Sequence, residues 1–372
     1  MPDVKEILAA FNVGGELKSV SEISSGHIND TYKAVVENGE GKECSYLIQR
    51  LNTDVFTKPV ELMKNVTGVT AHLRKAVEKN GGDPKRECLN VYKAANGSPY
   101  YIDSQGGFWR CFDFIDGAHS EQKVTSADTF RKSAEAFGRF QRLLSDYPID
   151  SLAETIPNFH NTVSRFADFK KAVDDNKSGR AGTCGEEIAF ALAREKDCAV
   201  FVDLLNKGEL PLRVTHNDTK LNNVMLDDVT GEGICVVDLD TVMPGLSLYD
   251  FGDSIRFGAS TADEDEKDLD KVHFSLEYYE AYAEGYLSEC GEALTAEEIE
   301  CLPYSGKLMT LECGMRFLGD YLNGDVYFKT DYPEHNLVRA RTQFKLVAEM
   351  EENMQSIRRV TEEVCKKLGI EK

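Results

Sequence analysis

The chain has 372 residues, of which 41% are hydrophobic and 29% charged, the composition of a globular protein with a substantial buried core. Its formal net charge of -21 at pH 7 opposes binding to a nucleic-acid backbone or an anionic membrane surface. We therefore expect neither nucleic acid nor membrane among its partners.

The cysteines and the first residues indicate the compartment. Ten cysteines are scattered singly, without a C-x-x-C pair or a cluster at zinc-ligand spacing, so reduced thiols explain them better than disulfides. Met1–Glu6 lacks the basic start and apolar core of a signal peptide, and no stretch approaches the roughly 18 apolar residues of a membrane span. We expect a cytoplasmic protein.

The first third of the chain reads as a small antiparallel sheet with one helix. A hairpin signal lies at Asn38–Gly41, and a helix is predicted to begin near Pro59, because apolar residues then recur at helical spacing as far as Leu73. The predicted strands are Val20–Ser24, Thr31–Val36, Ser45–Leu51, Tyr100–Asp103 and Phe108–Ile115.

The rest of the chain reads as long helices around one hairpin. Helices are expected from a cap at Ser126 or Asp128 to Leu144, and over about 161–175, 186–206, 265–289, 296–323 and 336–368. The hairpin pairs Val224–Asp227 with Ile234–Asp238. We expect an α+β protein with a β-rich lobe at 1–115 and a helical lobe at 116–372, joined by a hinge rather than a flexible linker.

The most informative segment is His216–Asn223, followed by the strand that ends at Asp238. Asp218 and Asn223 have the spacing of a kinase catalytic loop, in which the Asp accepts a hydroxyl proton and the Asn binds a metal ion. Asp238 stands where that pattern places its main magnesium ligand. Alone, Asp218 would be better explained as a turn or helix-cap residue, but three polar residues at this spacing favour a phosphoryl-transfer site.

Supporting roles are expected for the polar residues near this loop. His216 is predicted to brace the loop through backbone contacts, and Asp250 to cap a helix and brace the loop as well. Asp240 is left open between a second metal site, a substrate contact and a turn. The Asp250–Gly252 triplet is not read as the kinase Asp-Phe-Gly, because Asp238 already occupies that position.

The phosphate contacts are less clear from the sequence. The turn that contains Gly26 lies where a nucleotide-covering loop is expected, but it has one glycine instead of three, and an ordinary hairpin turn explains it as well. Gln49 and Arg50 occupy the strand that carries the kinase lysine. Only one of them can face the cleft, and we favour Arg50 because it can hold phosphate oxygens. Glu61 is the helix carboxylate expected to pair with it.

Arg316 lies in a largely apolar helical run, Leu308–Leu318. It can form an ion pair one turn away with Glu312 or Asp320 on an exposed face, or it can point into the cleft toward a sugar oxygen or a phosphate. The spacing does not decide between the two.

These residues carry a resemblance to a known family. The His216–Asn223 loop, the strand end at Asp238 and the Phe114–Gly117 hinge resemble the aminoglycoside phosphotransferase and choline kinase family, which has the two-lobed protein-kinase-like fold. Within that family, the chain is similar nearly end to end to the bacterial N-acetylhexosamine 1-kinases. The most specific segments are Gly26–Asn29, Leu212–Asn223, Asp250–Thr261, Glu312–Leu318 and Tyr332–Arg339.

The resemblance implies phosphorylation, by ATP with magnesium, of the anomeric hydroxyl of N-acetylglucosamine or N-acetylgalactosamine. It makes Asp218 the base and Asn223 and Asp238 the magnesium ligands. It assigns sugar contacts to His27 and Arg316, and also to Tyr327 and Phe257. It does not assign the phosphate contacts, and the residues expected to bind the nucleotide are Gly26, Gln49, Arg50 and Phe114.

Two rival functions remain at this stage. One is another small-molecule kinase of the same fold, acting on homoserine, choline, methylthioribose or an aminoglycoside. The other is a nucleotide-binding protein without catalytic activity, against which the intact set of Asp218, Asn223 and Asp238 speaks. The expected partners are ATP and a small sugar, and a monomer or small homo-oligomer is expected.

Overall fold

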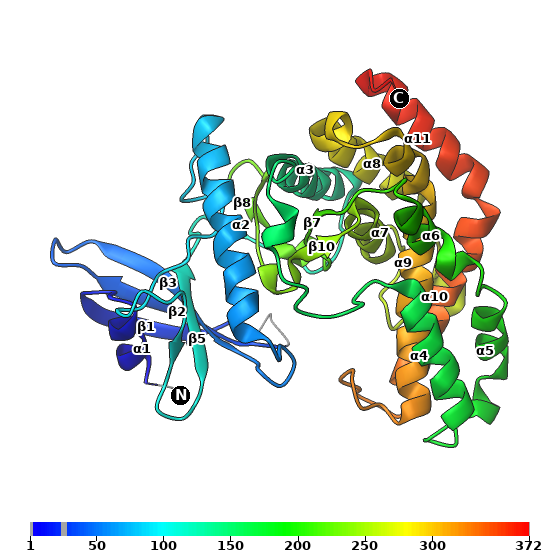
Figure 1. The fold of residues 1–372 in the computed structure, drawn as a ribbon, viewed down its shortest axis with the longest axis horizontal. Helices are drawn as coiled ribbons and strands as arrows, with labels where there is room; N and C mark the ends of the chain where they lie inside the picture. The colour runs from blue at the N-terminus through cyan, green and yellow to red at the C-terminus, as the bar shows by residue number, and fades with distance from the viewer. Residues whose placement is uncertain (1–2, 24–27, 372) are drawn as a thin grey trace. The chain divides into compact units, whose positions relative to one another are not determined.

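The structure, a computed structural model, describes residues 3–23 and 28–371. The chain forms two compact units. The first comprises Met1–Ser120, Asp146–Ile156 and Val224–Met243, and the second comprises Glu121–Ser145, Pro157–Asn223 and Pro244–Lys372. The first contains antiparallel strands and the second is mainly helical, which confirms the predicted α+β class (Figure 1). The predicted division of function between 1–115 and 116–372 stays a prediction.

A five-stranded antiparallel sheet forms the centre of the first unit. It contains β1 (Glu16–Glu22), β2 (Asp30–Glu37), β3 (Glu43–Leu51), β4 (Tyr101–Ile102) and β5 (Phe108–Asp113), in the order β1-β2-β3-β5-β4. In the register of β3 and β5, Gln49 lies opposite Arg110 and Arg50 opposite Trp109. Because paired residues share a face and neighbours alternate, Gln49 and Arg110 lie on one face of the sheet and Arg50 on the other.

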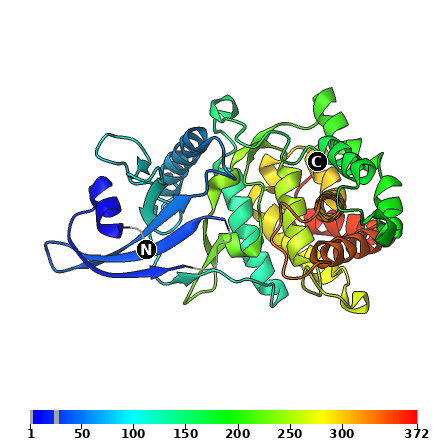
Figure 2. The same ribbon diagram turned by 90° about the horizontal axis from the view of Figure 1, so that it is seen from below.

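Two helices accompany this sheet. Helix α1 (Val4–Ala10) begins at Asp3, whose carboxylate accepts hydrogen bonds from the backbone N–H groups of its first turn. Its apolar side chains form a core with the sheet, including Ile7, Phe11, Ile48 and Trp109. Helix α2 (Pro59–Lys79) starts at a proline and buries Met63, Val66, Val69 and Leu73 at helical spacing. Both helices lie beside the strands in two perpendicular views (Figures 1 and 2).

A second sheet in this unit carries the hairpin near Asp238. Strands β6 (Ala118–His119), β8 (Val224–Asp227) and β9 (Gly233–Val236) pair antiparallel in the order β6-β8-β9. Strand β9 ends at Val236, two residues before the predicted end at Asp238. Asp238 instead adopts the left-handed conformation, with φ 59° and ψ 56°, and a short 3-10 turn follows it.

The second unit is built from nine helices in its described residues. Strand β7 (Arg213–Thr215) pairs with β10 (Met243–Gly245), most of which belongs to the same unit. The helices are α3 (Ala127–Leu143), α4 (Thr162–Asp175), α5 (Gly185–Leu192), α6 (Val200–Lys207), α7 (Ser247–Gly258), α8 (Leu276–Cys290), α9 (Ala296–Asn323), α10 (His335–Glu352) and α11 (Met354–Leu368).

Three predicted helices are wrong in extent. The helix predicted over 186–206 is interrupted between α5 and α6, where a charged run breaks its apolar face. The helix predicted over 265–289 begins only at Leu276, capped by Ser275, because the acidic residues before it repel one another in a helix. The helix predicted over 336–368 ends at Asn353, whose Nδ2 donates to the Glu349 carbonyl at 2.8 Å, and α11 restarts there.

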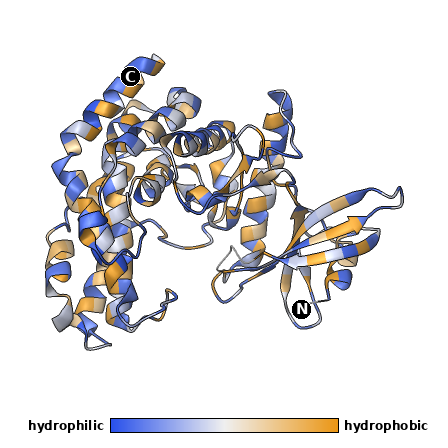
Figure 3. Cartoon of the chain, turned by 180° about the vertical axis from the view of Figure 1, so that it is seen from behind, coloured by the Kyte–Doolittle hydropathy of each residue, from blue (hydrophilic) through white to orange (hydrophobic). Residues whose placement is uncertain are grey.

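Helix α7 was suggested by the sequence only through a predicted helix cap at Asp250. This prediction is wrong, because α7 begins at Ser247 and Asp250 lies within its first turn. Its residues are buried except Phe257, which is half-buried, so its apolar residues show no one-sided period. A Cβ at Gly252 would lie 2.5 Å from the Ser305 carbonyl oxygen of α9, so only glycine permits this close approach. The more peripheral helices alternate hydrophobic and hydrophilic residues around their axes (Figure 3). None of the helices among residues 3–23 and 28–371 is both long and apolar enough to cross a membrane.

Candidate active site

The predicted catalytic loop follows β7 and is held by the first turn of α7. The Asp250 carboxylate is 3% exposed and accepts hydrogen bonds from the backbone N–H groups of His216, at 2.9 Å, and Asn217, at 2.7 Å. Asn217 has a φ of 65°, which is rare for a residue other than glycine. Two charge-assisted hydrogen bonds around this residue fix the direction in which the chain enters Asp218.

His216 lies completely inside the second unit. Its ring makes edge contacts with Phe137, at 5.7 Å between centroids, and Phe140, at 6.1 Å, both on α3. Its Nδ1 accepts a hydrogen bond from the Asp218 backbone N–H at 3.3 Å. His216 therefore contacts the loop backbone and is shielded from any substrate by aromatic rings.

The residue after Asp218 is also fixed by α7. The Thr219 N–H donates to Asp253 Oδ2 at 3.0 Å, and its hydroxyl donates to the Asp250 carbonyl at 2.5 Å. The Ser254 hydroxyl donates to the Thr219 carbonyl at 2.7 Å. Asp250, Asp253 and Ser254 thus bind both sides of Asp218, which leaves its side chain little freedom of position.

The Asp218 side chain lies between a cation and an amide. Lys220 Nζ is 3.2 Å from Asp218 Oδ1, and the Asp218 charge raises the pKa of Lys220. Asn223 Nδ2 donates to the Asp218 carbonyl at 2.8 Å and lies 3.3 Å from its Oδ2. Both contacts use the amide nitrogen of Asn223, and neither uses its oxygen. Lys220 was not singled out from the sequence, although its place two residues after the candidate base is visible there.

Arg316 lines a cavity of about 200 Å³ in the second unit. Its guanidinium lies between the rings of Phe159, Tyr327 and Phe328, at 5.7, 5.8 and 5.5 Å from their centroids. The cavity is also lined by Arg165, whose pKa is lowered by burial and by the Arg316 charge beside it.

The possible ion-pair partners of Arg316 bind elsewhere. Glu312 accepts hydrogen bonds from His160 and Thr162. Asp320 accepts backbone hydrogen bonds from Val326–Phe328. In the part of the chain that the structure describes, the Arg316 guanidinium forms neither a hydrogen bond nor an ion pair. The alternative of a helix-surface ion pair is therefore not what the structure shows.

The loop that carries Tyr327 is organised by Asp320. Its Oδ1 accepts from the N–H groups of Val326, at 3.0 Å, and Tyr327, at 2.9 Å, and its Oδ2 accepts from Phe328 N–H at 2.9 Å and Asn336 Nδ2 at 3.0 Å. Four hydrogen bonds to one buried carboxylate make a rigid loop. Tyr327 remains 67% exposed, so its ring is presented at the mouth of the cavity.

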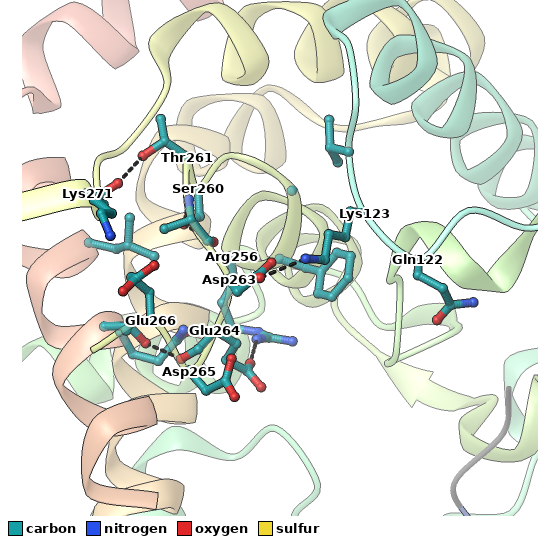
Figure 4. A pocket seen from close by; sticks show the side chains of 17 residues that line it. Gln122, Lys123, Arg256, Ser260, Thr261, Asp263, Glu264, Asp265, Glu266 and Lys271 are labelled. Atoms are coloured by element: carbon teal, nitrogen blue, oxygen red, sulfur yellow. Dashed lines mark hydrogen bonds and ion pairs between the residues drawn. The ribbon is translucent and has the colours of Figure 1, made fainter. Parts of the chain in front are cut away.

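Phe257, the other predicted sugar contact, lines a different and larger cavity of about 640 Å³. Charged residues surround that cavity, including Lys123, Arg256 and the acidic run Asp263–Glu266 (Figure 4). The cations there are paired: Lys123 Nζ lies 2.7 Å from Asp263, and Arg256 binds both Asp253 and Glu264 at 2.8 Å. The lining of the Arg316 cavity does not include Phe257, so the structure does not bring these predicted sugar contacts into one cavity.

In the first unit, Gln49 and Arg50 have different surroundings. Arg50 is half exposed, and its guanidinium lies 3.9 Å from the Asp30 carboxylate. Gln49 Nε2 donates to Thr31 Oγ1 at 2.8 Å, and its Oε1 accepts from Arg110 Nε at 2.9 Å. The cation that contacts Gln49 is therefore Arg110 of β5, which the sequence suggested only as part of a strand.

Arg110 and Asp240 form a buried ion pair, each with a side chain 3% exposed. The other Asp240 oxygen accepts from Asn29 Nδ2 at 2.8 Å, and Asn29 Oδ1 accepts from the Asn52 N–H at 2.9 Å. Both carboxylate oxygens of Asp240 thus have protein partners. Asp240 lies in the short 3-10 turn Leu239–Thr241, so the turn is the one of its three expected roles that the structure shows, and its side chain also holds Asn29.

The remaining predicted contacts with nucleotide, sugar and metal are placed as follows. Phe114 is half-buried just after β5, and Lys33 Nζ lies 3.8 Å above its ring. Asp238 has the left-handed backbone described above. Among the described residues, no group of three or more His, Cys, Asp and Glu side chains is arranged to hold a metal ion. Gly26 and His27 lie outside the described residues.

Known proteins resemble this chain in sequence and in structure. The sequence model of the phosphotransferase enzyme family matches residues 19–294. A spectinomycin phosphotransferase in complex with ADP and spectinomycin superimposes with a TM-score of 0.55 at 12% identity, covering 92% of this chain and 94% of that chain. A microcompartment-associated aminopropanol kinase gives 0.56 at 16%, covering 95% and 97%.

A choline kinase from Cryptosporidium parvum Iowa II gives a TM-score of 0.51 at 17% identity, covering 96% of this chain and 94% of that chain. At these identities the structural likeness concerns the fold alone. It confirms the predicted two-lobed kinase-like fold.

Proposed function

This chain belongs to the phosphotransferase enzyme family, and from that premise we propose that it transfers the γ-phosphoryl group of ATP to the anomeric hydroxyl of N-acetylglucosamine or N-acetylgalactosamine. The observation that carries the choice of a sugar is the Arg316 guanidinium, which has three aromatic neighbours and no carboxylate partner among the described residues. An unpaired, oriented donor beside aromatic rings suits a neutral acceptor with carbonyl and hydroxyl oxygens. The resemblance of the Glu312–Leu318 segment to N-acetylhexosamine 1-kinases supports the same choice.

Asp218 is the proposed base. It accepts the proton of the anomeric hydroxyl while that oxygen forms a bond to phosphorus and the bond to the departing ADP breaks. A hemiacetal hydroxyl is more acidic than an ordinary alcohol, so the carboxylate mainly orients it and accepts its proton late. Lys220, 3.2 Å from Asp218, places a positive charge where the phosphoryl group carries negative charge.

Asn223 and Asp238 are the proposed magnesium ligands, assigned from their spacing in the sequence. Oxygen ligands of this kind suit Mg²⁺, which usually takes one or two protein ligands and completes its shell with water and phosphate oxygens. The Asn223 amide fits, because its contacts with Asp218 use the nitrogen and not the oxygen. When bound, magnesium neutralises charge on the phosphate chain.

The nucleotide contacts are proposed for Gly26, Phe114 and one of Gln49 and Arg50, which lie on opposite faces of the sheet. Nucleotide use is supported by the family and by the ADP complex of the spectinomycin phosphotransferase. Gln49 is already bound to Thr31 and Arg110, which favours Arg50 as the residue free to move toward phosphate oxygens. We propose a cytoplasmic enzyme, monomeric or a small homo-oligomer.

The Arg316 cavity is lined by charges of both signs, the guanidinium groups of Arg165 and Arg316 and the carboxylates of Asp168 and Asp320. Choline and aminopropanol are the acceptors named for two kinases of this fold. Turnover with each of them, compared with turnover with a neutral sugar, therefore decides between the two kinds of acceptor.

The test is an acceptor panel with ADP release as the readout. Purified protein, ATP and magnesium are combined with each N-acetylhexosamine, with glucose and galactose, and with choline, aminopropanol, homoserine and an aminoglycoside. We expect turnover with the N-acetylated sugars and little with the amines. Turnover only with an amine would refute the proposed acceptor, and no turnover with any compound would support the nucleotide-binding alternative.

A further inference from the structure

His160 connects two parts of the second unit that are distant in sequence. It precedes α4 and is 7% exposed. Its Nδ1 lies 2.8 Å from Glu312 Oε1 on α9, and its Nε2 lies 3.0 Å from the Asn217 carbonyl oxygen in the catalytic loop. One ring therefore contacts both the helix that carries Arg316 and the residue before Asp218.

These contacts define the protonation of the ring. A carbonyl oxygen has no proton to give, and an ionised carboxylate is an acceptor only, so both ring nitrogens must donate. A ring with two N–H groups is an imidazolium. Burial alone would lower the pKa of His160, but the Glu312 charge outweighs it and the pKa is raised above 6.5. The same pairing lowers the pKa of Glu312, although burial alone would raise it.

The peptide group between Asn217 and Asp218 is held from both ends by histidines. His160 Nε2 donates to its carbonyl oxygen at 3.0 Å, and His216 Nδ1 accepts from its N–H at 3.3 Å. Since Asn217 has a left-handed backbone that costs free energy in a residue other than glycine, its conformation depends on such contacts. A substitution of His160 therefore alters the orientation of the peptide plane that precedes the Cα atom of Asp218, and with it the direction of the Asp218 side chain.

Glu312 provides the connection to the acceptor cavity. Its second oxygen accepts from Thr162 Oγ1 at 2.8 Å, so both oxygens are bound. Glu312 is one helical turn before Arg316 and thus on the same side of α9. Phe159, the residue before His160, lies 5.7 Å from the Arg316 guanidinium. A shift of this part of α9 or of the Phe159 ring is transmitted directly to His160.

Resting on the proposed function, we propose that His160, as an imidazolium between Glu312 and the Asn217 carbonyl, is a positioning residue that sets the orientation of Asp218 and couples it to occupation of the Arg316 cavity. Such a residue touches neither acceptor nor nucleotide. Its loss reduces the rate of transfer more than it reduces binding of either substrate.

Other charged groups also face this ring. Asp250 and Asp253 lie on α7, and the charge of Asp253 acts in the same direction as that of Glu312. Arg165 and Arg316 face Glu312 and compete with His160 for its charge. The Tyr249 ring is 5.3 Å from that of His160 and is neutral, since burial raises its pKa. Glu312 is the only carboxylate with a described hydrogen bond to the ring.

The kinetic test compares Glu312→Gln with Glu298→Gln. Both glutamates lie on α9, are 1% exposed and have a lowered pKa, but Glu298 binds Arg213 and Ser247 instead of His160. Below the pKa of His160 the ring is an imidazolium and holds the Asn217 carbonyl, and this contact is lost as the pH rises through that pKa. We therefore expect kcat of the wild type to fall on the alkaline side. We expect E312Q to move this fall to lower pH by about one unit or more, and E298Q to leave its position unchanged.

Replacement of His160 tests the same contact. We expect His160→Leu to lower kcat about 100-fold, as for a misplaced catalytic group, to change both KM values less than about 3-fold by the same reasoning, and to remove the alkaline fall due to this ring. His160→Gln, which can still donate to the Asn217 carbonyl, recovers part of kcat. Equal loss in H160L and H160Q, or an unmoved alkaline fall in E312Q, would overturn the proposal.

A measurement without turnover separates this inference from the proposed function. In the full chain labelled with ¹⁵N-histidine, the His160 ring signals are identified among the seven histidines by their loss in H160Q. We expect two protonated ring nitrogens at pH 7 in the wild type and a ring that loses a proton at lower pH in E312Q. A singly protonated ring at pH 7 refutes the proposal whatever the acceptor is, while a doubly protonated ring in a protein inactive on sugars would refute only the proposed function.

Discussion

The variant Asp250→Asn tests whether Asp250 supports the catalytic loop, because it should lower activity without a comparable loss of protein stability. Asn keeps the shape of the side chain but replaces one accepting oxygen by an NH₂ group, so one of the N–H groups of His216 and Asn217 loses its partner. A lost hydrogen bond to a charged group in the interior costs about 1.5–3 kcal/mol. Against this, the burial that raises the pKa of Asp250 from 3.8 to about 6 opposes its ionisation at pH 7 by about 3 kcal/mol.

The two effects nearly cancel at pH 7, so we expect D250N to unfold in urea with a free energy within about 2 kcal/mol of the wild type. The loop, however, loses the contact that directs the chain into Asp218, and we expect kcat to fall about 100-fold with little change in either KM. A variant as stable as the wild type but much less active is the signature of this role.

The direction of the Asp250 pKa shift determines how the free energy of unfolding changes with pH. Because the folded pKa of Asp250, about 6, lies above the unfolded value of 3.8, the folded state binds the extra proton. Its stabilising contribution is complete below the unfolded value and is lost as the pH rises through about 6. The wild type should therefore gain about 2.4 kcal/mol relative to D250N between pH 7 and pH 4, and its kcat should fall below about pH 6 as the carboxylate is protonated. A stability difference independent of pH, or full activity of D250N, would refute this reasoning.

Four further outcomes follow from the same contacts. Asp218→Asn should lower kcat by about 100-fold or more without loss of folding, measured by ADP release and thermal unfolding; near-normal turnover would remove Asp218 from the role of base. Arg316→Ala should raise the acceptor KM about 10-fold and leave the ATP KM unchanged in steady-state kinetics. Asp320→Asn should loosen the Tyr327 loop and raise the acceptor KM in the same assay, whereas an unchanged KM would contradict the placement of that loop beside the acceptor. Gly252→Ala should destabilise by about 1–3 kcal/mol in urea unfolding, because its Cβ meets a backbone oxygen of α9, whereas Gly185→Ala, with open space around its Cβ, should not.

The sequence predicted those features that are contiguous along the chain. Asp218 and Asn223 lie five residues apart in one loop, and their spacing alone suggested the chemistry. The buried face of α2 could be predicted from the sequence because one side of this helix is buried and the other is exposed. Helix α7 escaped a pattern-based prediction because it is buried on nearly all sides, and its polar residues at Asp250, Asp253 and Ser254 face the loop instead of solvent.

Contacts between distant segments could not be read from the sequence. His160 is 57 residues from Asn217 and 152 from Glu312, and a lone histidine near a predicted helix start carries no signal of either partner. Arg110 became recognisable only through the register of β3 and β5, which places it beside Gln49. Whether Arg316 forms an ion pair depends on what Glu312 and Asp320 bind, and only the fold shows those partners.

The most direct test of the proposed reaction is phosphorus NMR of the product formed from ATP, magnesium and each N-acetylhexosamine. We predict a sugar monophosphate whose phosphorus signal is coupled to the anomeric proton, formed by the wild type and absent with D218N. A phosphate on another hydroxyl of the sugar, or a product formed equally well by D218N, would contradict transfer to the anomeric oxygen with Asp218 as the base.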